Sequence, residues 1–331
     1  FYVNAFDING NVSESTDELI SAHYFEDDAE LVSFSVLPEN TSVSNIFPSH
    51  IEINIIGEGT ATSNYHNIAG HEYWGWYGSL THIDPRKGYW ITTSDPFIVI
   101  NSGQKEIITE YVLQEGLNLL SYTCPNAGSV AQIVNNDCVD GILGQGVASY
   151  HIDGMGWIGS LGALESGRGY WFRSNCITTF NYSCPESNYE LVRNDFSKES
   201  QKEYTQSTQQ AFYFIKDIDN VEPGDIIEAY NENTLVGSRT WIGDYTDIPV
   251  MGVDNNILTD KYCHNNSVPN FKLIKSDGEV FQLNGDIPNW NNNGLFIVEK
   301  MTTSQIVPEK YYVSPAYPNP FNPTTSIELA L

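Results

Sequence analysis

The chain has 331 residues, of which 42 are Asp or Glu and 15 are Lys or Arg, so its formal net charge at pH 7 is −27. This charge excludes a nucleic-acid-binding function, because a phosphate backbone would be repelled, and it disfavours anionic membrane surfaces. The sequence has no apolar run of about 18 residues, so it predicts no membrane span.

The N-terminal residues 1–13 alternate as a strand and contain a turn-forming cluster, Asp7-Ile-Asn-Gly-Asn11. The pattern Y-x-V-x-A-x-D-x-x-G-N-x-S resembles the last hairpin of a fibronectin type III domain. This resemblance implies that residues 1–22 are the tail of such a domain. The rest of its sandwich would then precede Phe1 in a longer protein.

An internal repeat follows, with one copy in residues 23–110 and a second in residues 111–185. The matching blocks are residues 42–46 with 129–133, 55–62 with 142–149, 76–80 with 157–161, and 88–91 with 169–172. The offset is 87 in the first two blocks and 81 in the last two. One insertion in the first copy, within residues 64–75, explains this change.

Each copy predicts the same order of elements. An apolar strand (residues 31–37 or 117–122) precedes a short segment with helical spacing (residues 42–47 or 129–134). A strand with a Gly-x-Gly turn, a Trp-x-Gly-Ser-Leu strand and a Gly-Tyr-Trp strand complete the unit. Tryptophans recur at matching places, which favours a shared hydrophobic core over a ligand platform. These tryptophans are Trp76 with Trp157, and Trp90 with Trp171.

The insertion in the first copy carries aromatic residues that have no counterpart in the second. These are Tyr65, Tyr73 and Trp74. If an aromatic set binds a ligand such as an extracellular polysaccharide, this set is the better candidate.

Five cysteines are present, and none forms a C-x-x-C pair, so a zinc site is not expected. Four of them lie close together in the second copy. In an exported protein they favour two local disulfides, Cys124–Cys138 and Cys176–Cys184, although other connectivities remain open. Cys263 is then left without an assigned partner.

Residues 186–210 are polar and have no periodic apolar face, so we expect a linker there. Residues 211–310 then predict a third β-module, because short strands follow one another with turn residues between them. This spacing is typical of a sandwich or a small barrel. The predicted strands are residues 211–215, 225–230, 235–241, 247–253, 270–275, 280–283 and 294–299.

The C-terminal residues 311–331 contain a proline-rich run followed by a T-x-I-x-x-x-L strand. The run consists of Pro318, Asn319, Pro320, Phe321, Asn322 and Pro323. It resembles the start of the sorting domain of type IX secretion cargo proteins, and the third module resembles uncharacterised β-modules of the same proteins. The resemblance implies recognition by the type IX machinery and a location outside the cell or on its surface. A proline-rich linker is the competing interpretation.

The sequence offers few patterns for chemistry. It has no Gly-x-Ser-x-Gly elbow, and His71-Glu72 is not followed by the second histidine of a zinc motif. Calcium is the most plausible ion, with loop carboxylates at Asp217, Asp219 and Asp254 as its ligands. Ordinary Asx turns explain the same residues and are favoured. We therefore predict neither an enzyme nor a bound cofactor.

Together these observations predict a mainly β protein, built from tandem small β-modules with little helix. We expect a non-catalytic structural or adhesive segment of a large secreted bacterial surface protein. One form of this hypothesis is an extracellular filament subunit that self-associates. The alternative is a set of carbohydrate-binding modules that accompany an upstream secreted hydrolase.

Overall fold

The computed structural model describes residues 19–26, 28–68, 70–103, 108, 110–186, 204–305, 312–313 and 329–330. Strands dominate these ranges, and they form several separate, mainly antiparallel sheets, which confirms the predicted fold class. The fibronectin-like residues 1–18 and the sorting-signal residues 318–323 lie outside the described ranges. Within the predicted sorting segment, β25 (Tyr312–Val313) pairs with β26 (Leu329–Ala330).

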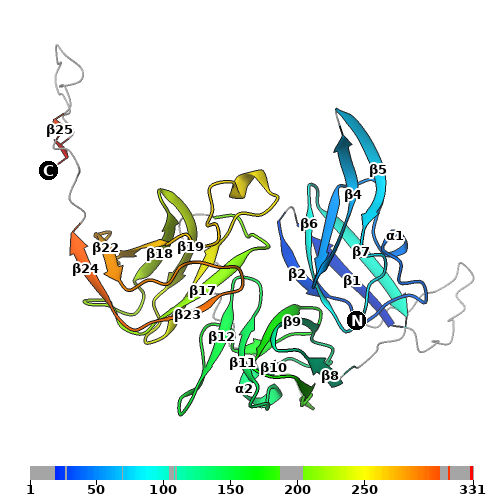
Figure 1. The fold of residues 1–331 in the computed structure, drawn as a ribbon, viewed down its shortest axis with the longest axis horizontal. Helices are drawn as coiled ribbons and strands as arrows, with labels where there is room; N and C mark the ends of the chain where they lie inside the picture. Colours follow the sequence, from blue (N-terminus) through cyan, green and yellow to red (C-terminus); the bar gives the residue numbers. More distant parts are fainter. Residues whose placement is uncertain are drawn as a thin grey trace, which may run out of the picture.

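The first repeat is a sheet faced by a strand pair and a short helix (Figure 1). Its sheet order is β2 (Glu30–Ser33), β6 (Gly88–Thr93), β3 (Ile53–Gly57), β4 (Thr60–Ile68) and β5 (His71–Gly78). The pair consists of β1 (Leu19–Phe25) and β7 (Phe97–Gly103), and the helix is α1 (Val43–Ile46). The repeat therefore begins before residue 23, because Leu19 already pairs with Gly103.

The second repeat has the same topology. Its sheet order is β9 (Gly116–Ser121), β15 (Gly169–Ser174), β11 (Val139–Leu143), β12 (Ala148–Ile152) and β13 (Gly156–Ile158). The strand pair is β8 (Glu110–Leu113) with β16 (Thr178–Asn181), the helix is α2 (Val130–Ile133), and β10 (Gly128–Ser129) pairs with β14 (Ala163–Leu164). The repeat found in the sequence is thus a repeat of folded units.

Local sequence explains why each unit folds this way. In α1, Val43 and Ile46 are buried, and a separation of three residues places both on one side of the helix. In β3, Ile53 and Ile55 are fully buried because alternate residues of a strand share one face. Tyr89 packs in the same core, and its hydroxyl accepts a hydrogen bond from Asp84 N at 2.8 Å. Burial raises the pKa of Tyr89 to about 12.

The predicted tryptophan core is correct for one pair and wrong for the other. Trp76 and Trp157 pack against the cores of their own repeats. Trp90, in contrast, lies on the opposite face of its sheet, because its neighbours Tyr89 and Ile91 point into the core. The equivalent Trp171 is also on the outer face, and both contribute to contacts between modules.

The third module is a sandwich of two sheets. One sheet has the order β20 (Thr246–Met251), β17 (Gln210–Ile215) and β23 (Leu295–Val298), with β17 and β23 parallel. The other has the order β19 (Thr234–Thr240), β18 (Ile226–Asn231), β21 (Asn270–Ile274), β22 (Val280–Gly285) and β24 (Met301–Gln305). A short 3₁₀ helix, η1 (Ile257–Thr259), follows β20. Strand β24 was not predicted.

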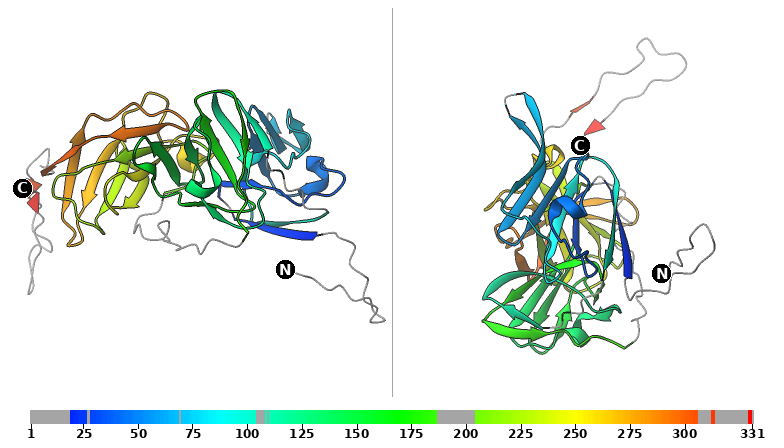
Figure 2. Two further views of the ribbon diagram at one scale, coloured as in Figure 1. Left: turned by 90° about the horizontal axis from the view of Figure 1, so that it is seen from below. Right: turned by 90° about the vertical axis from the view of Figure 1, so that its right-hand side faces the viewer.

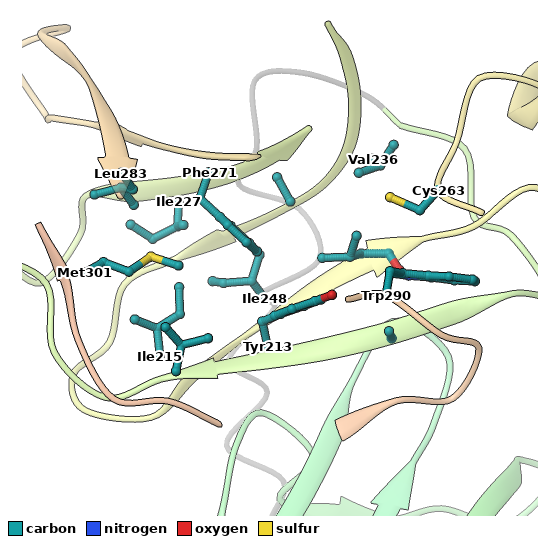
Figure 3. Packing of buried hydrophobic residues seen from close by; sticks show 14 of the residues in the cluster. Tyr213, Ile215, Ile227, Val236, Ile248, Cys263, Phe271, Leu283, Trp290 and Met301 are labelled. Atoms are coloured by element: carbon teal, nitrogen blue, oxygen red, sulfur yellow. The ribbon is translucent and has the colours of Figure 1, made fainter. Parts of the chain in front are cut away.

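Side chains from both sheets fill the space between them (Figure 3). Tyr213 of β17 meets Phe271 of β21 with ring centroids 5.4 Å apart, and both side chains are fully buried. The predicted linker is partly wrong here, because residues 204–210 belong to this module. Ser207 is fully buried and donates a hydrogen bond from its hydroxyl to Asp254 at 3.0 Å. Polar residues can therefore pack where a half-buried carboxylate accepts their hydrogen bonds.

Reciprocal hydrogen bonds join the two repeats. Ser33 N donates to Gly167 O at 2.9 Å, and the equivalent Ser121 N donates to Arg86 O at 3.1 Å. Leu31 N donates to Gln145 Oε1 at 3.1 Å, and the equivalent Leu119 N donates to Glu58 Oε2 at 3.3 Å. Equivalent residues thus make equivalent bonds in both directions, which is the pattern of a two-fold, self-complementary interface.

A glycine from each repeat lies at the centre of this interface. A Cβ added to Gly88 would lie 3.0 Å from the Cα of Gly169, and one added to Gly169 would lie 3.1 Å from the Cα of Gly88. Leu31 and Leu119 pack beside the glycines, and together with Trp90 they form a buried cluster. The close approach of the two backbones therefore depends on the missing side chains.

The second repeat also packs against the third module, so that it contacts both of its neighbours (Figure 2). Phe212 and Phe214 of β17 are fully buried against Leu143 and Ala148 of the second repeat. A Cβ added to Gly159 would lie 2.7 Å from Phe214 Cε1. The outer face of the sheet of the second repeat is therefore the surface on which the third module packs.

Candidate functional site

The β4–β5 hairpin extends away from the body of the first repeat (Figure 1). It contains the insertion recognised in the sequence. A β-bulge lies between Ser63 and Tyr65, where the register with β5 shifts. The extra residue is on β5, because Gly75 and Trp76 both lie opposite Asn64. Asn64 is fully buried and fixes the base of the hairpin, because its Oδ1 accepts a hydrogen bond from Ile53 N at 2.8 Å.

Two of the predicted ligand-binding residues lie together on this hairpin. Tyr65 and Trp74 are direct cross-strand partners, and their ring centroids are 5.1 Å apart. The Tyr65 hydroxyl donates to Glu72 Oε1 at 3.3 Å. Trp74 is 49% exposed, so the pair offers an accessible aromatic surface.

The third predicted residue, Tyr73, lies on the other face of the hairpin, because it pairs with His66. The ring of His66 meets that of Tyr77 at 4.9 Å. Tyr73 is 48% exposed and Tyr77 is 59% exposed. Tyr77 was not predicted, because it matches Ile158 of the second repeat and so looked like a structural strand residue. The hairpin therefore carries exposed aromatic rings on both faces.

The predicted calcium ligands are not brought together. Asp217 and Asp219 share the ammonium group of Lys300, at 3.4 Å and 2.9 Å respectively. Asp254 lies elsewhere in the module. Its Oδ1 accepts from Asn256 N at 2.9 Å, which is an Asx turn, and from the Thr259 hydroxyl at 2.8 Å. In the part of the chain that the structure describes, no three His, Cys, Asp or Glu side chains gather to hold a metal ion.

All four clustered cysteines form disulfides, but the predicted pairing is wrong. The bonds are Cys124–Cys184 and Cys138–Cys176, whose partners are 60 and 38 residues apart. The folded sheet decides the pairing. Cys138 lies just before β11 and Cys176 just after β15, and these strands are neighbours, so their ends meet. Local spacing carries no information of this kind.

Cys263 is free and fully buried in the core of the third module. Burial raises the pKa of its thiol to about 12. A thiol with so little thiolate at neutral pH is a poor nucleophile, so this residue packs as a small apolar side chain.

A buried ion pair of the third module bonds to the second repeat, and no sequence pattern indicated it. Asp247 is fully buried and accepts hydrogen bonds from the backbone N and the hydroxyl of Ser160, both at 2.7 Å. Arg239 lies 3.4 Å from the same carboxylate and donates to Gly146 O at 2.7 Å. Burial raises the pKa of Asp247, while Arg239 and Ser160 oppose that rise.

No helix in the described ranges is long and apolar enough to cross a bilayer. Comparisons of the chain with protein-family models, curated proteins and solved structures find no match.

Proposed function

We propose that this chain is a non-catalytic structural or adhesive segment of a large secreted bacterial surface protein. The observation that carries this proposal is that the modules are joined through surfaces as deeply buried as their own cores. Trp90 is 2% exposed and Leu119 is fully buried between the repeats, and Phe212 and Phe214 are fully buried between the second repeat and the third module. Such contacts hold modules in fixed positions, whereas flexible linkers let them move.

Two further observations support export. The disulfides Cys124–Cys184 and Cys138–Cys176 are consistent with an extracytoplasmic location, because disulfides persist in oxidising compartments. The run at residues 318–323 resembles a type IX sorting signal. The acidic net charge of −27 favours solubility of an exposed surface protein.

Small-angle X-ray scattering of the full chain tests whether the modules hold fixed relative positions. We expect one fixed arrangement of residues 19–305 to fit the curve. A Phe214→Glu variant places a charge between the second repeat and the third module, and it should broaden the distance distribution. If the unmodified chain is fitted only by modules that move independently, the proposal is wrong. Sedimentation velocity on the same samples tests the filament version, which requires species that grow with concentration.

Carbohydrate binding is the second candidate, and the exposed rings of the β4–β5 hairpin favour it. Tyr65 and Trp74 present an aromatic surface that can stack on the apolar face of a sugar ring. Affinity electrophoresis in gels that contain polysaccharide tests this function. A Trp74→Ala variant should migrate faster than the unmodified chain in the gel that retards it. Equal migration of the two proteins in every gel would exclude carbohydrate binding by the β4–β5 hairpin.

A further inference from the structure

A groove opens in the second repeat where strands β11 and β12 separate. Their pairing ends at Gly141 and Tyr150, while β12 continues to pair with β13 as far as Ile152 and Gly156. The β12–β13 hairpin therefore leaves β11, and a groove of about 710 Å³ lies beside it. Tyr245 and Glu299 of the third module also line it. We call this the β11–β12 groove.

A β-bulge on β11 directs a carboxylate toward the groove. The register with β15 changes from Val139–Ser174 to Gly141–Arg173, so Asp140 is the extra residue. Bulges commonly re-aim a side chain in this way. Asp140 is held by Arg173, whose Nε and Nη2 donate at 2.7 Å and 2.9 Å, and by Asn175 Nδ2 at 3.0 Å. The carboxylate therefore has a fixed orientation.

The first repeat is closed at the corresponding place. There the bulge lies on β5, and β3 has no bulge against β6. The buried Asn64 of β4 bridges the gap to β3 by bonding to Ile53 N at 2.8 Å and Ile51 O at 2.6 Å. The aligned residue in the second repeat is His151, which lines the groove instead. The two copies thus differ at the position that decides whether this site is open.

A disulfide fixes the rim of the groove. Cys138 directly follows the lining segment 135–137, and Cys176 directly follows the lining residue Asn175. Asn175 N also donates to Cys138 O at 2.7 Å. The first repeat contains no cysteine, so this bond occurs only in the copy with the open groove. A rim held in place before binding reduces the entropy cost of binding.

The walls combine an aromatic surface with amides and carboxylates. His151 and Trp157 are direct cross-strand partners with ring centroids 5.3 Å apart, and both are partly exposed. Asn135 is exposed on the rim, and Asp137 and Asp153 add negative charge. The acidic lining disfavours anionic ligands, while amides and carboxylates can bond to hydroxyl groups.

We propose that the β11–β12 groove binds a neutral glycan. A pyranose ring stacks with its C–H face on Trp157, whose ring His151 meets edge-on. The hydroxyl groups of the sugar bond to Asp140, Asn175 and Asn135. Pockets between modules, lined by aromatic side chains and a few oriented polar groups, are typical ligand sites. This site is separate from the β4–β5 hairpin, so each can fail its test without the other.

The test is affinity electrophoresis of the full chain in gels that contain laminarin, hydroxyethylcellulose, xylan or galactomannan, with alginate as the anionic comparison. Trp157→Ala should weaken binding by about tenfold or more, since it removes the aromatic surface on which the sugar stacks. Because Trp157 also packs on the core, Asn135→Ala is the second variant, and it should weaken binding about threefold. Tyr24→Ala is the matched control and should retain this binding, because Tyr24 is 56% exposed on β1, outside both the groove and the β4–β5 hairpin.

Loss of retardation in Trp157→Ala and weaker retardation in Asn135→Ala, with Tyr24→Ala unchanged, would support glycan binding in the groove. Urea unfolding of each variant shows whether Trp157→Ala is folded, and if it is not, Asn135→Ala decides. Retardation by none of the neutral glycans, or by alginate alone, would overturn the proposal. Retardation that Trp74→Ala abolishes and Asn135→Ala leaves unchanged would also overturn it, and would place binding on the hairpin.

Discussion

Replacing Gly88 by alanine should loosen the contact between the two repeats. The new Cβ would lie 2.8 Å from Leu119 Cδ1, 3.0 Å from the Cα of Gly169 and 3.1 Å from Leu120 O. Two of these three atoms belong to the backbone, so they cannot move aside by rotating a side chain. Overpacking of this kind costs about 1–3 kcal/mol. Gly169→Ala should cost a similar amount, because its Cβ would lie 2.8 Å from Val32 O.

The assay is urea unfolding of the full chain, followed by tryptophan fluorescence, since Trp90 lies in this interface. Gly162→Ala is the matched control, because its Cβ would have no atom within 4 Å and its backbone is not left-handed. It should be neutral or slightly stabilising. The double variant Gly88→Ala with Gly169→Ala should lose less free energy of unfolding than the sum of the two single variants. The reason is that either methyl group alone already forces the two backbones apart. Equal unfolding midpoints for Gly88→Ala and Gly162→Ala would refute the packing described here.

Three other predictions follow from the buried groups. Replacing both Cys124 and Cys184 by serine should lower the free energy of unfolding by about 4 kcal/mol, because the unfolded chain regains the entropy of a loop that spans 60 residues. Urea titration measures this change, and a decrease well under about 1 kcal/mol would contradict the prediction. Cys263, whose thiol pKa burial raises to about 12, should not react with a thiol reagent at pH 8 until the chain unfolds, and rapid labelling of the native chain would show that the site is open. Burial acts to raise the pKa of Glu30, but hydrogen bonds from His23 and Glu26 N and the charge of Arg168 outweigh it and hold that pKa below its ordinary value of 4.5. The stability that Glu30 contributes is therefore present above pH 4.5 and is lost as the pH falls through the folded pKa. The difference in Tm between the unmodified chain and Glu30→Gln should therefore become smaller below pH 4.5. A difference in Tm that stays constant with pH would contradict this prediction.

Strand positions could be predicted where alternation or a repeat made them visible. The matching blocks around Ile55 and Ile142 correctly indicated two copies of one unit, and the Val43/Ile46 spacing indicated the short helix. The face of the sheet that Trp90 occupies was not predicted, because a tryptophan buried between modules has the same sequence pattern as one buried within a module.

Features that depend on contacts between distant residues could not be predicted from the sequence. Four cysteines allow three connectivities, and only the neighbouring positions of β11 and β15 select Cys138–Cys176. Residues 204–210 looked like a linker because their polar side chains bond to groups far along the chain, as Ser207 does to Asp254. The β11–β12 groove depends on where a bulge lies, and the bulge at Asp140 is invisible in the sequence, because the offset between the repeats is 87 on both sides of it.

The reciprocal contact between the repeats resembles the contact of a homodimer whose subunits have been fused into one polypeptide. In a true homodimer every substitution appears twice, so both halves must tolerate it. Here each half is encoded separately. One half could therefore gain an aromatic hairpin while the other gained two disulfides and a face for the third module, and the shared Gly88–Gly169 contact kept them together.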